Sequence, residues 1–159
     1  MKTCIALAGL ALAACASYSG NGLKPGAATE NDVRATMGRP ALELPDRGGG
    51  KELIYPKGPL GTQTFIAHVD AKGVLAGIDQ VLDDDHFRDI REGQTRDDVL
   101  RMIGPPGETM GFRSGNYAWQ YRFMDTWGYL SNFNVTFNRE GIVVDKIAIR
   151  IERNDAADH

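Results

Sequence analysis

The amino-acid sequence predicts an α+β fold of two tandem repeats. Each repeat is expected to be a short helical segment followed by a three-stranded antiparallel meander, with the helices on one face of the sheet. Three observations lead to this prediction: the chain aligns with itself at a shift of 66 residues, each copy opens with helix-capping residues, and each copy continues with alternating apolar and polar residues. Helices and antiparallel strands in this order are typical of α+β domains.

The residues before the repeats have the pattern of an export signal. Lys2 supplies a positive charge, and residues 5–14 form an uninterrupted run of apolar and small side chains that ends at Cys15. The run is too short to span a membrane. Leu12-Ala13-Ala14-Cys15 resembles the lipobox of bacterial lipoproteins, which implies cleavage of a signal peptide (residues 1–14) after Ala14 and attachment of diacylglycerol and palmitate to Cys15. Ordinary secretion with cleavage nearby, or burial of the segment as a helix, are the alternatives.

The residues after the cysteine suggest where the protein is sorted. In the sorting that this resemblance implies, an Asp after the cysteine favours the inner membrane, whereas this chain has Ala16. The resemblance therefore implies a lipid anchor in the outer membrane of a Gram-negative bacterium, with the protein facing the periplasm. Residues 15–24 are expected to form a short lipidated tether.

The repeat is evident from residues that match at constant spacing. At a shift of 66 the matching pairs are Thr29 and Thr95, Asp32 and Asp98, Val33 and Val99, Gly38 and Gly104, Pro40 and Pro106, and Tyr55 and Tyr121. Later pairs match at slightly larger shifts, as insertions in loops would produce. Residues 25–82 are thus predicted to form repeat 1, residues 83–89 a linker, residues 90–152 repeat 2 and residues 153–159 a C-terminal tail.

Each repeat is predicted to open with a helix of two or three turns. In repeat 2, Thr95 suits the N-cap, and Asp98 stands at the third helical position, where its carboxylate can accept a backbone N–H group. Gly104 suits the residue that ends a helix, and Pro106 prevents its continuation. The matching residues of repeat 1 predict the same helix. A brief additional helix is expected over residues 87–90, before repeat 2.

The strands are predicted from alternation. From Tyr117 to Phe123 every second residue is aromatic, which is the period of a strand with one buried face. Residues 133–137 repeat the alternation, and the turn 138–141 places glycine at its last position before a return strand over residues 143–151. In repeat 1 the same hairpin is expected over residues 65–69, 70–73 and 74–82, after a poorer strand over residues 51–55.

Composition restricts the classes of function. The chain is 42% hydrophobic and carries a formal charge of −3, which becomes −4 once the signal with its single charged residue, Lys2, is removed. Nucleic acid is a poor candidate partner for an acidic protein. Both cysteines, Cys4 and Cys15, lie in the first fifteen residues, so the mature chain is expected to fold without a disulfide.

Two segments contain residue types that are found in metal sites or phosphate-binding loops. Residues 83–86, Asp-Asp-Asp-His, are metal-ligand types, but consecutive positions point in different directions, which favours a solvated linker over a metal site. Residues 48–51, Gly-Gly-Gly-Lys, lack the glycine spacing of a phosphate-binding loop and are expected to form a hairpin loop. The three histidines, His68, His86 and His159, have no nucleophile to activate. We expect no catalytic residue, metal or cofactor, and hence a protein that is not an enzyme.

Aromatic residues outside the alternating strands are the best candidates for binding a partner. Trp127 and Tyr129 fall in an expected loop, residues 124–131, where no periodic pattern requires their burial. A small local core beneath the loop is the alternative. Phe112 and Arg113, in the other long loop of repeat 2, are weaker candidates of the same kind.

Repeat 2 resembles a known family. The resemblance runs from Ile90 to Ile149 and rests on Ile90-Arg91-Glu92-Gly93-Gln94-Thr95, Val99, Gly104, Pro106, the strand Trp119-x-Tyr121-x-Phe123, and Val135-Thr136-Phe137-Asn138 with Gly141. These residues resemble the BamE family (SmpA/OmlA) of outer-membrane lipoproteins. Repeat 1 fits the pattern less well, and the tandem arrangement is similar to that of the secreted β-lactamase inhibitor proteins, whose two repeats share one long sheet.

The resemblance implies two functions. The first is a non-enzymatic accessory lipoprotein that binds proteins of the outer-membrane β-barrel assembly machinery. The second is a tethered periplasmic protein that binds or inhibits another envelope protein, such as an enzyme.

The predicted anchor can be tested at Cys15. We expect Cys15→Ser to abolish acylation, because the thiol is the only group of the lipobox that can take the lipid. Mass spectrometry of the N-terminal peptide checks this, and recovery of an acylated peptide from the variant would refute the assignment.

Overall fold

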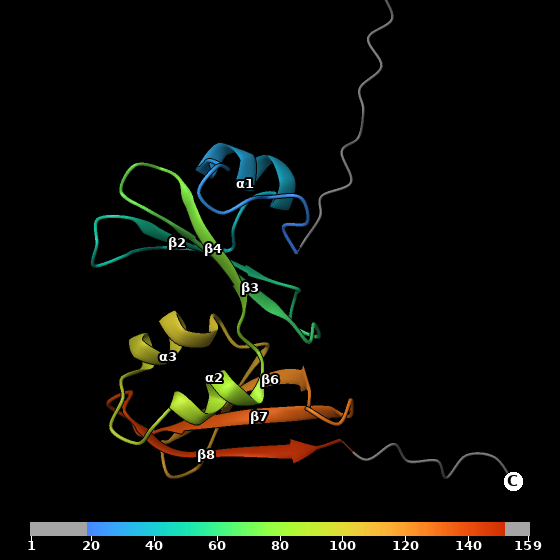
Figure 1. Cartoon of the computed structure of the whole chain (residues 1–159). Coiled ribbons are helices and arrows are strands. Elements are labelled where there is room, and N and C mark those ends of the chain that lie inside the picture. The colour runs from blue at the N-terminus through green and yellow to red at the C-terminus, as the bar shows by residue number, and fades with distance from the viewer. Residues whose placement is uncertain (1–18, 152–159) are drawn as a thin grey trace, which may run out of the picture.

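The computed structural model describes residues 19–151; the predicted signal, Cys15 and the tail after residue 152 lie outside the described residues. The described chain stacks four layers in the order helix, sheet, helix pair, sheet (Figure 1). The α+β class is confirmed. None of the helices in residues 19–151 has the length and apolar character needed to cross a bilayer.

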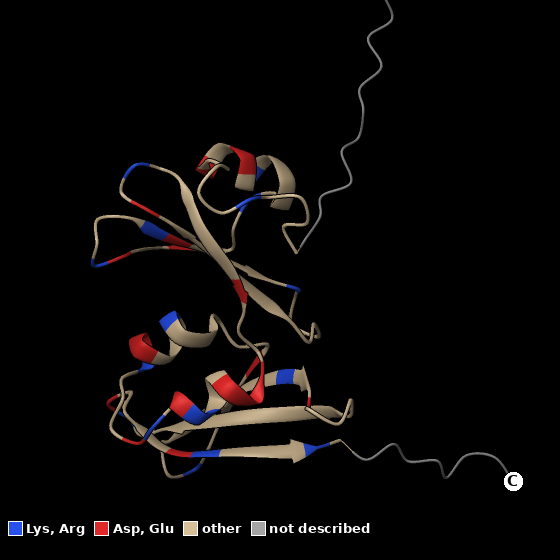
Figure 2. Ribbon diagram, viewed as in Figure 1, with Lys and Arg blue, Asp and Glu red and all other residues tan. Residues whose placement is uncertain are grey.

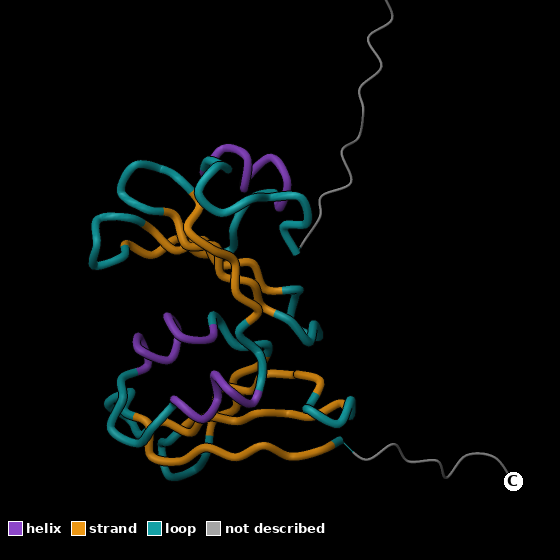
Figure 3. Tube along the Cα trace, in the orientation of Figure 1, coloured by secondary structure: helices purple, strands orange, loops and turns teal. Residues whose placement is uncertain are grey.

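Each repeat contributes one antiparallel meander (Figure 3). Repeat 1 comprises α1 (Glu30–Met37), β1 (Leu42–Pro45), β2 (Lys51–Pro56), β3 (Thr64–Val69) and β4 (Leu75–Gln80). Repeat 2 comprises α2 (Asp84–Asp89), α3 (Arg96–Ile103), β5 (Glu108–Gly111), β6 (Tyr117–Met124), β7 (Leu130–Phe137) and β8 (Val143–Arg150). The strands pair in chain order within each sheet. We call the two sheets sheet 1 and sheet 2.

The expectation of three strands per sheet was wrong, because β1 and β5 add a fourth strand to each. β5 has three exposed residues and one half-buried residue, so its sequence shows no alternation. The two sheets are also separate, which removes the single long sheet that the resemblance to β-lactamase inhibitors implied.

The main helices begin and end where the capping residues predicted. The Thr95 hydroxyl accepts the backbone N–H of Asp98 at 3.1 Å, and the Asp98 carboxylate accepts that of Thr95 at 2.8 Å. The hydroxyl and the backbone N–H of Thr95 together hold the pKa of Asp98 below its usual value. Gly104 ends α3 at φ 78° and ψ −171°, a conformation that is essentially restricted to glycine.

The segment expected to be a linker contains helix α2, whose Phe87 side chain joins the core. Asp83 is the N-cap of α2, and its carboxylate accepts the backbone N–H of His86 at 3.0 Å. Phe87 is buried and stacks on Phe133, with 4.0 Å between ring centroids. The brief helix expected from residue 87 thus begins at Asp84, because an aspartate in this triplet caps it.

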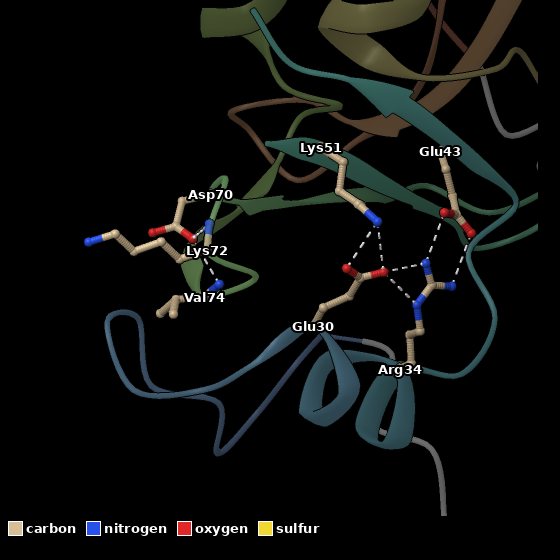
Figure 4. Close-up of polar contacts among 7 residues, drawn as sticks. All are labelled: Glu30, Arg34, Glu43, Lys51, Asp70, Lys72 and Val74. Atoms are coloured by element: carbon tan, nitrogen blue, oxygen red, sulfur yellow. Dashed lines mark hydrogen bonds and ion pairs between the residues drawn. The ribbon is translucent and has the colours of Figure 1, made fainter. Parts of the chain in front are cut away.

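Sheet 1 is buried on both faces. On one face Leu53 and Tyr55 pack with α1, and on the other Ile54 and Ile66 join the core that α2, α3 and sheet 2 enclose. Four charged side chains connect α1 to the edge of sheet 1: Arg34 pairs with Glu30 and Glu43, and Lys51 pairs with Glu30 (Figure 4). The two repeats therefore form one stacked body.

The junction between the repeats lies at the end of α3. A Cβ atom on Gly104 would stand 2.9 Å from the Thr64 methyl carbon and 3.1 Å from that of Ile54. The buried hydroxyl of Tyr121 donates to the carbonyl oxygen of Gly104 at 3.0 Å. Close approach of the repeats thus requires glycine here.

We expect Gly104→Ala to destabilise the fold more than Gly38→Ala. Both glycines have positive φ, so each substitution should cost about 1–3 kcal/mol in strain. A Cβ at Gly38 meets open space, whereas one at Gly104 meets repeat 1, which should add about 1–3 kcal/mol. Urea unfolding of the two variants measures the difference, and equal losses would contradict the close junction.

Candidate protein-binding site

Within residues 19–151, five hairpins share one turn. In each, the N–H of the first residue donates to the carbonyl oxygen of the fifth, and the N–H of a glycine at the fourth position donates to the carbonyl oxygen of the first. The turns span residues 46–50, 70–74, 112–116, 125–129 and 138–142. The fourth-position glycines have φ between 79° and 87°, which is why glycine recurs there.

The turn exposes its third residue. The third residues are Gly48, Lys72, Ser114, Trp127 and Glu140, and all five are exposed. Figure 4 shows this turn around Asp70, whose carboxylate accepts the backbone N–H groups of Lys72 and Val74, both at 2.9 Å, while the Lys72 side chain extends away from the strands. Four of the third positions hold glycine or a polar residue. The fifth holds Trp127, a large apolar side chain that is 80% exposed.

Asp125 organises the turn that carries Trp127. One carboxylate oxygen, Oδ1, accepts the backbone N–H of Trp127 at 3.0 Å and that of Tyr129 at 2.8 Å. The other, Oδ2, pairs with the Arg150 guanidinium at 3.0 Å. Desolvation raises the pKa of Asp125, but the bonds from Tyr129, Arg150 and Trp127 together lower it below its usual value. The carboxylate is therefore charged at neutral pH.

Two further elements hold the turn from outside. Asp84 of α2 accepts both the backbone N–H and the hydroxyl of Thr126, the first at 3.2 Å. Arg150 of β8 lies over the Tyr129 ring, with 4.0 Å from its Cζ to the ring centroid. We call Trp127, Tyr129 and these supporting residues the Trp127 surface. A hollow next to Trp127, lined by Asp84, Phe123, Asp125, Ser131, Ala148 and Arg150, offers room for a partner's side chain.

The structure divides the predicted site residues between two places. Trp127 and Tyr129 follow β6, whereas Phe112 and Arg113 precede it in the turn 112–116, so the two pairs lie at opposite ends of the strand. All four side chains are exposed. The local core that was the alternative for the loop does not form around Trp127. The aromatic residues of β6 do face the core, and Tyr121 and Phe123 are each 1% exposed.

Sequence reasoning missed the residues that support the Trp127 surface. Asp125 was detectable, because Asp125-x-x-Gly128 has the spacing of Asp70-x-x-Gly73 in repeat 1. Asp84 and Arg150 gave no signal, since their contacts join residues 42 and 25 positions apart.

Comparison with known proteins does not decide a family. No family model matches the chain, and no curated protein matches it. A solved structure described as the osmotically inducible lipoprotein OsmE is 22% identical, with 42% of this chain and 78% of that chain covered and a TM-score of 0.38. An extracellular protein of Bacillus anthracis that contains an SCP domain is 11% identical, with 76% of this chain and 42% of that chain covered and a TM-score of 0.29. Because both TM-scores are low, membership of the BamE family stays a prediction.

We expect Asp125→Ala to loosen the turn that presents Trp127. Loss of the carboxylate leaves the N–H groups of Trp127 and Tyr129 without their acceptor, so their hydrogen exchange should quicken by about tenfold, equivalent to about 1.4 kcal/mol. Asp70→Ala is the matched control, because it loosens the equivalent turn of repeat 1. Unchanged exchange at both amides of Asp125→Ala would show that the carboxylate does not hold the turn.

The same turn should resist acid. Because the pKa of Asp125 is lower in the folded than in the unfolded chain, its stabilisation is present above the unfolded pKa of about 3.9 and is lost as the pH falls through the lower folded value. The protection of the two amides, measured as their exchange rate relative to that of the unfolded chain, should therefore persist at pH values just below the usual carboxyl range.

Proposed function

We propose that this chain is a non-enzymatic lipoprotein that binds other proteins, anchored in the outer membrane through Cys15 and facing the periplasm. Its role is that of an accessory module in β-barrel assembly. The lipobox at residues 12–15 supports the anchor, and the resemblance of residues 90–149 to the BamE family supports the role.

The Trp127 surface is the observation that carries the proposal. Tryptophan contributes more binding energy to protein interfaces than most residues, because it buries a large apolar area and loses few rotamers. The side chain is 80% exposed here, while its turn is already held by Asp125 and Asp84. A partner therefore gains the apolar contact without the entropic cost of ordering the loop.

The same rigid turn also fits the alternative, a tethered inhibitor or binding protein of an envelope enzyme. A projecting aromatic residue on an ordered hairpin can enter a cleft, as well as pack on a flat surface. The identity of the partner separates the two functions.

Crosslinking in cells tests both. A photoreactive phenylalanine analogue in place of Trp127 should crosslink a subunit of the β-barrel assembly machinery, and the same analogue in place of Lys72 should not. Lys72 is the matched control, because it occupies the same exposed position of the same turn in repeat 1. A soluble periplasmic enzyme as the main product would support the alternative, and the absence of any protein crosslinked more from 127 than from 72 would count against both.

We also expect Trp127→Ala to weaken partner binding without loss of stability. Removal of an aromatic residue at the centre of an interface costs about 2 kcal/mol or more, which is at least about thirtyfold in Kd. The free energy of unfolding should change little, because the side chain makes few contacts within the chain. Titration calorimetry with the crosslinked partner and urea unfolding measure the two quantities, and Lys72→Ala is the control.

A further inference from the structure

Strand β8 has the longest uncovered edge of the two sheets in residues 19–151. The outer strands β1 and β5 have four residues each, and β1 ends at Pro45. β4 has six residues, and residues before α1 cover the first of them, since Gly26 donates to the Leu75 carbonyl oxygen and Leu75 donates to that of Ala28, both at 2.8 Å. β8 has eight residues, and residues 93–94 cover its first residue, Val143, in the same way, so β8 leaves the longer edge.

The free backbone groups of β8 can be assigned from its pairing. The N–H of Ile151 donates to the carbonyl oxygen of Leu130 at 2.9 Å, so Ile151 bonds toward β7. Bonding direction alternates along an antiparallel strand. Ile147 and Ile149 therefore also bond toward β7, and the N–H and C=O groups of Ala148 and Arg150 point away from the sheet. Among the described residues, no hydrogen bond to another segment satisfies these outward groups.

The β8 edge carries apolar side chains on the open face of sheet 2. Ile147, Ile149 and Ile151 are 50%, 51% and 36% exposed, and they share the face of sheet 2 that lies away from the helices. Residues 147–149 are uncharged and lie between Lys146 and Arg150, whose side chains are turned to the Phe87 carbonyl oxygen and to Asp125 within the chain (Figure 2). Soluble proteins normally blunt such an edge with a charge, a proline or a cover. A long uncovered edge with three exposed isoleucines thus indicates a binding surface for another strand.

We propose that the strand is β8 of a second copy of this chain, paired antiparallel about a two-fold axis at Ile149. In this register Ala148 of each copy stands opposite Arg150 of the other, and the outward N–H and C=O groups of both residues are satisfied. Ile149 faces Ile149, and Ile147 faces Ile151, so all six isoleucines gather on one face. The two sheets become one continuous sheet of eight strands.

Other registers are less favourable. Residues that stand opposite each other in the dimer must lie on the same face of the joined sheet. The two-fold axis can therefore pass through a residue of β8 but not between two residues. An axis at Ala148 sets Lys146 opposite Arg150, and an axis at Ile147 sets Ile149 opposite Asp145. An axis at Ile149 avoids both pairings. The two-fold contact also uses the edge of each copy once, so the assembly closes as a dimer and leaves no β8 edge for further growth.

Sedimentation velocity on the full chain in mild detergent tests the proposal, which does not depend on the proposed function. The wild type should pass from monomer to dimer as its concentration rises. Ile149→Lys places two ammonium groups opposite each other, and Ala148→Pro removes an outward N–H. Each should raise the dissociation constant at least about tenfold.

The controls separate association from folding. Neither substitution removes a bond to β7, so the thermal unfolding of both monomers should match that of the wild type. Phe112→Lys, on a residue 48% exposed at a distant turn, should leave association unchanged. A chain that stays monomeric at the highest concentration, or a dimer that withstands both β8 substitutions, overturns the proposal. Association that is lost only in Phe112→Lys overturns it as well.

Discussion

The architecture depends on one close contact, the approach of the α3 C-terminus to sheet 1. Gly104 permits that approach, because a Cβ atom would stand within 2.9 Å of Thr64, and Tyr121 satisfies the carbonyl oxygen that the helix end leaves free. With α3 in place, Ile54 and Ile66 are buried beneath it. The contact turns two small repeats, each with a modest core, into one body in which sheet 1 is covered on both faces.

The two repeats differ on the sheet face that receives the next layer in repeat 1 and is open in repeat 2. Under the repeat alignment, Ile54 and Ile66 of sheet 1 correspond to Gln120 and Asn134 of sheet 2, at shifts of 66 and 68. The isoleucines receive the next helix layer, whereas the Gln120 amide donates to Asn134 at 3.1 Å across β6 and β7. A polar pair at this place makes sheet 2 a terminal unit, as capping repeats do in stacked arrays. Its turns and its β8 edge are then left to contact other molecules.

Local rules predicted part of this fold. Thr29, Thr95 and their aspartates identified both helix starts, because a capping box involves neighbours in sequence. The layering was also present as a signal: Leu53-Ile54-Tyr55 and Phe65-Ile66-Ala67 are continuous apolar runs, typical of strands buried on both faces. β5 could not be predicted, since its residues are largely exposed and only pairing with β6 makes them a strand. The exposure of Trp127 was foreseeable, but its rigidity comes from Asp84 and Arg150, which are distant in sequence.

A shared turn makes the Trp127 surface informative. In all five hairpins the first and fourth residues form the hydrogen bonds of the turn. The side chain of the third residue is not needed for the turn, so its identity depends on what it contacts outside the chain, either solvent or a partner. The surface also adjoins the β8 edge through Arg150, whose guanidinium supports Asp125 and Tyr129 while its backbone points outward. A dimer axis at Ile149 sets the two Trp127 turns on either side of that axis, a few residues away along the strand. A dimer with two such surfaces binds a partner that has two sites more tightly than a single surface does, because the second contact forms within the same complex. The same holds for two neighbouring partners.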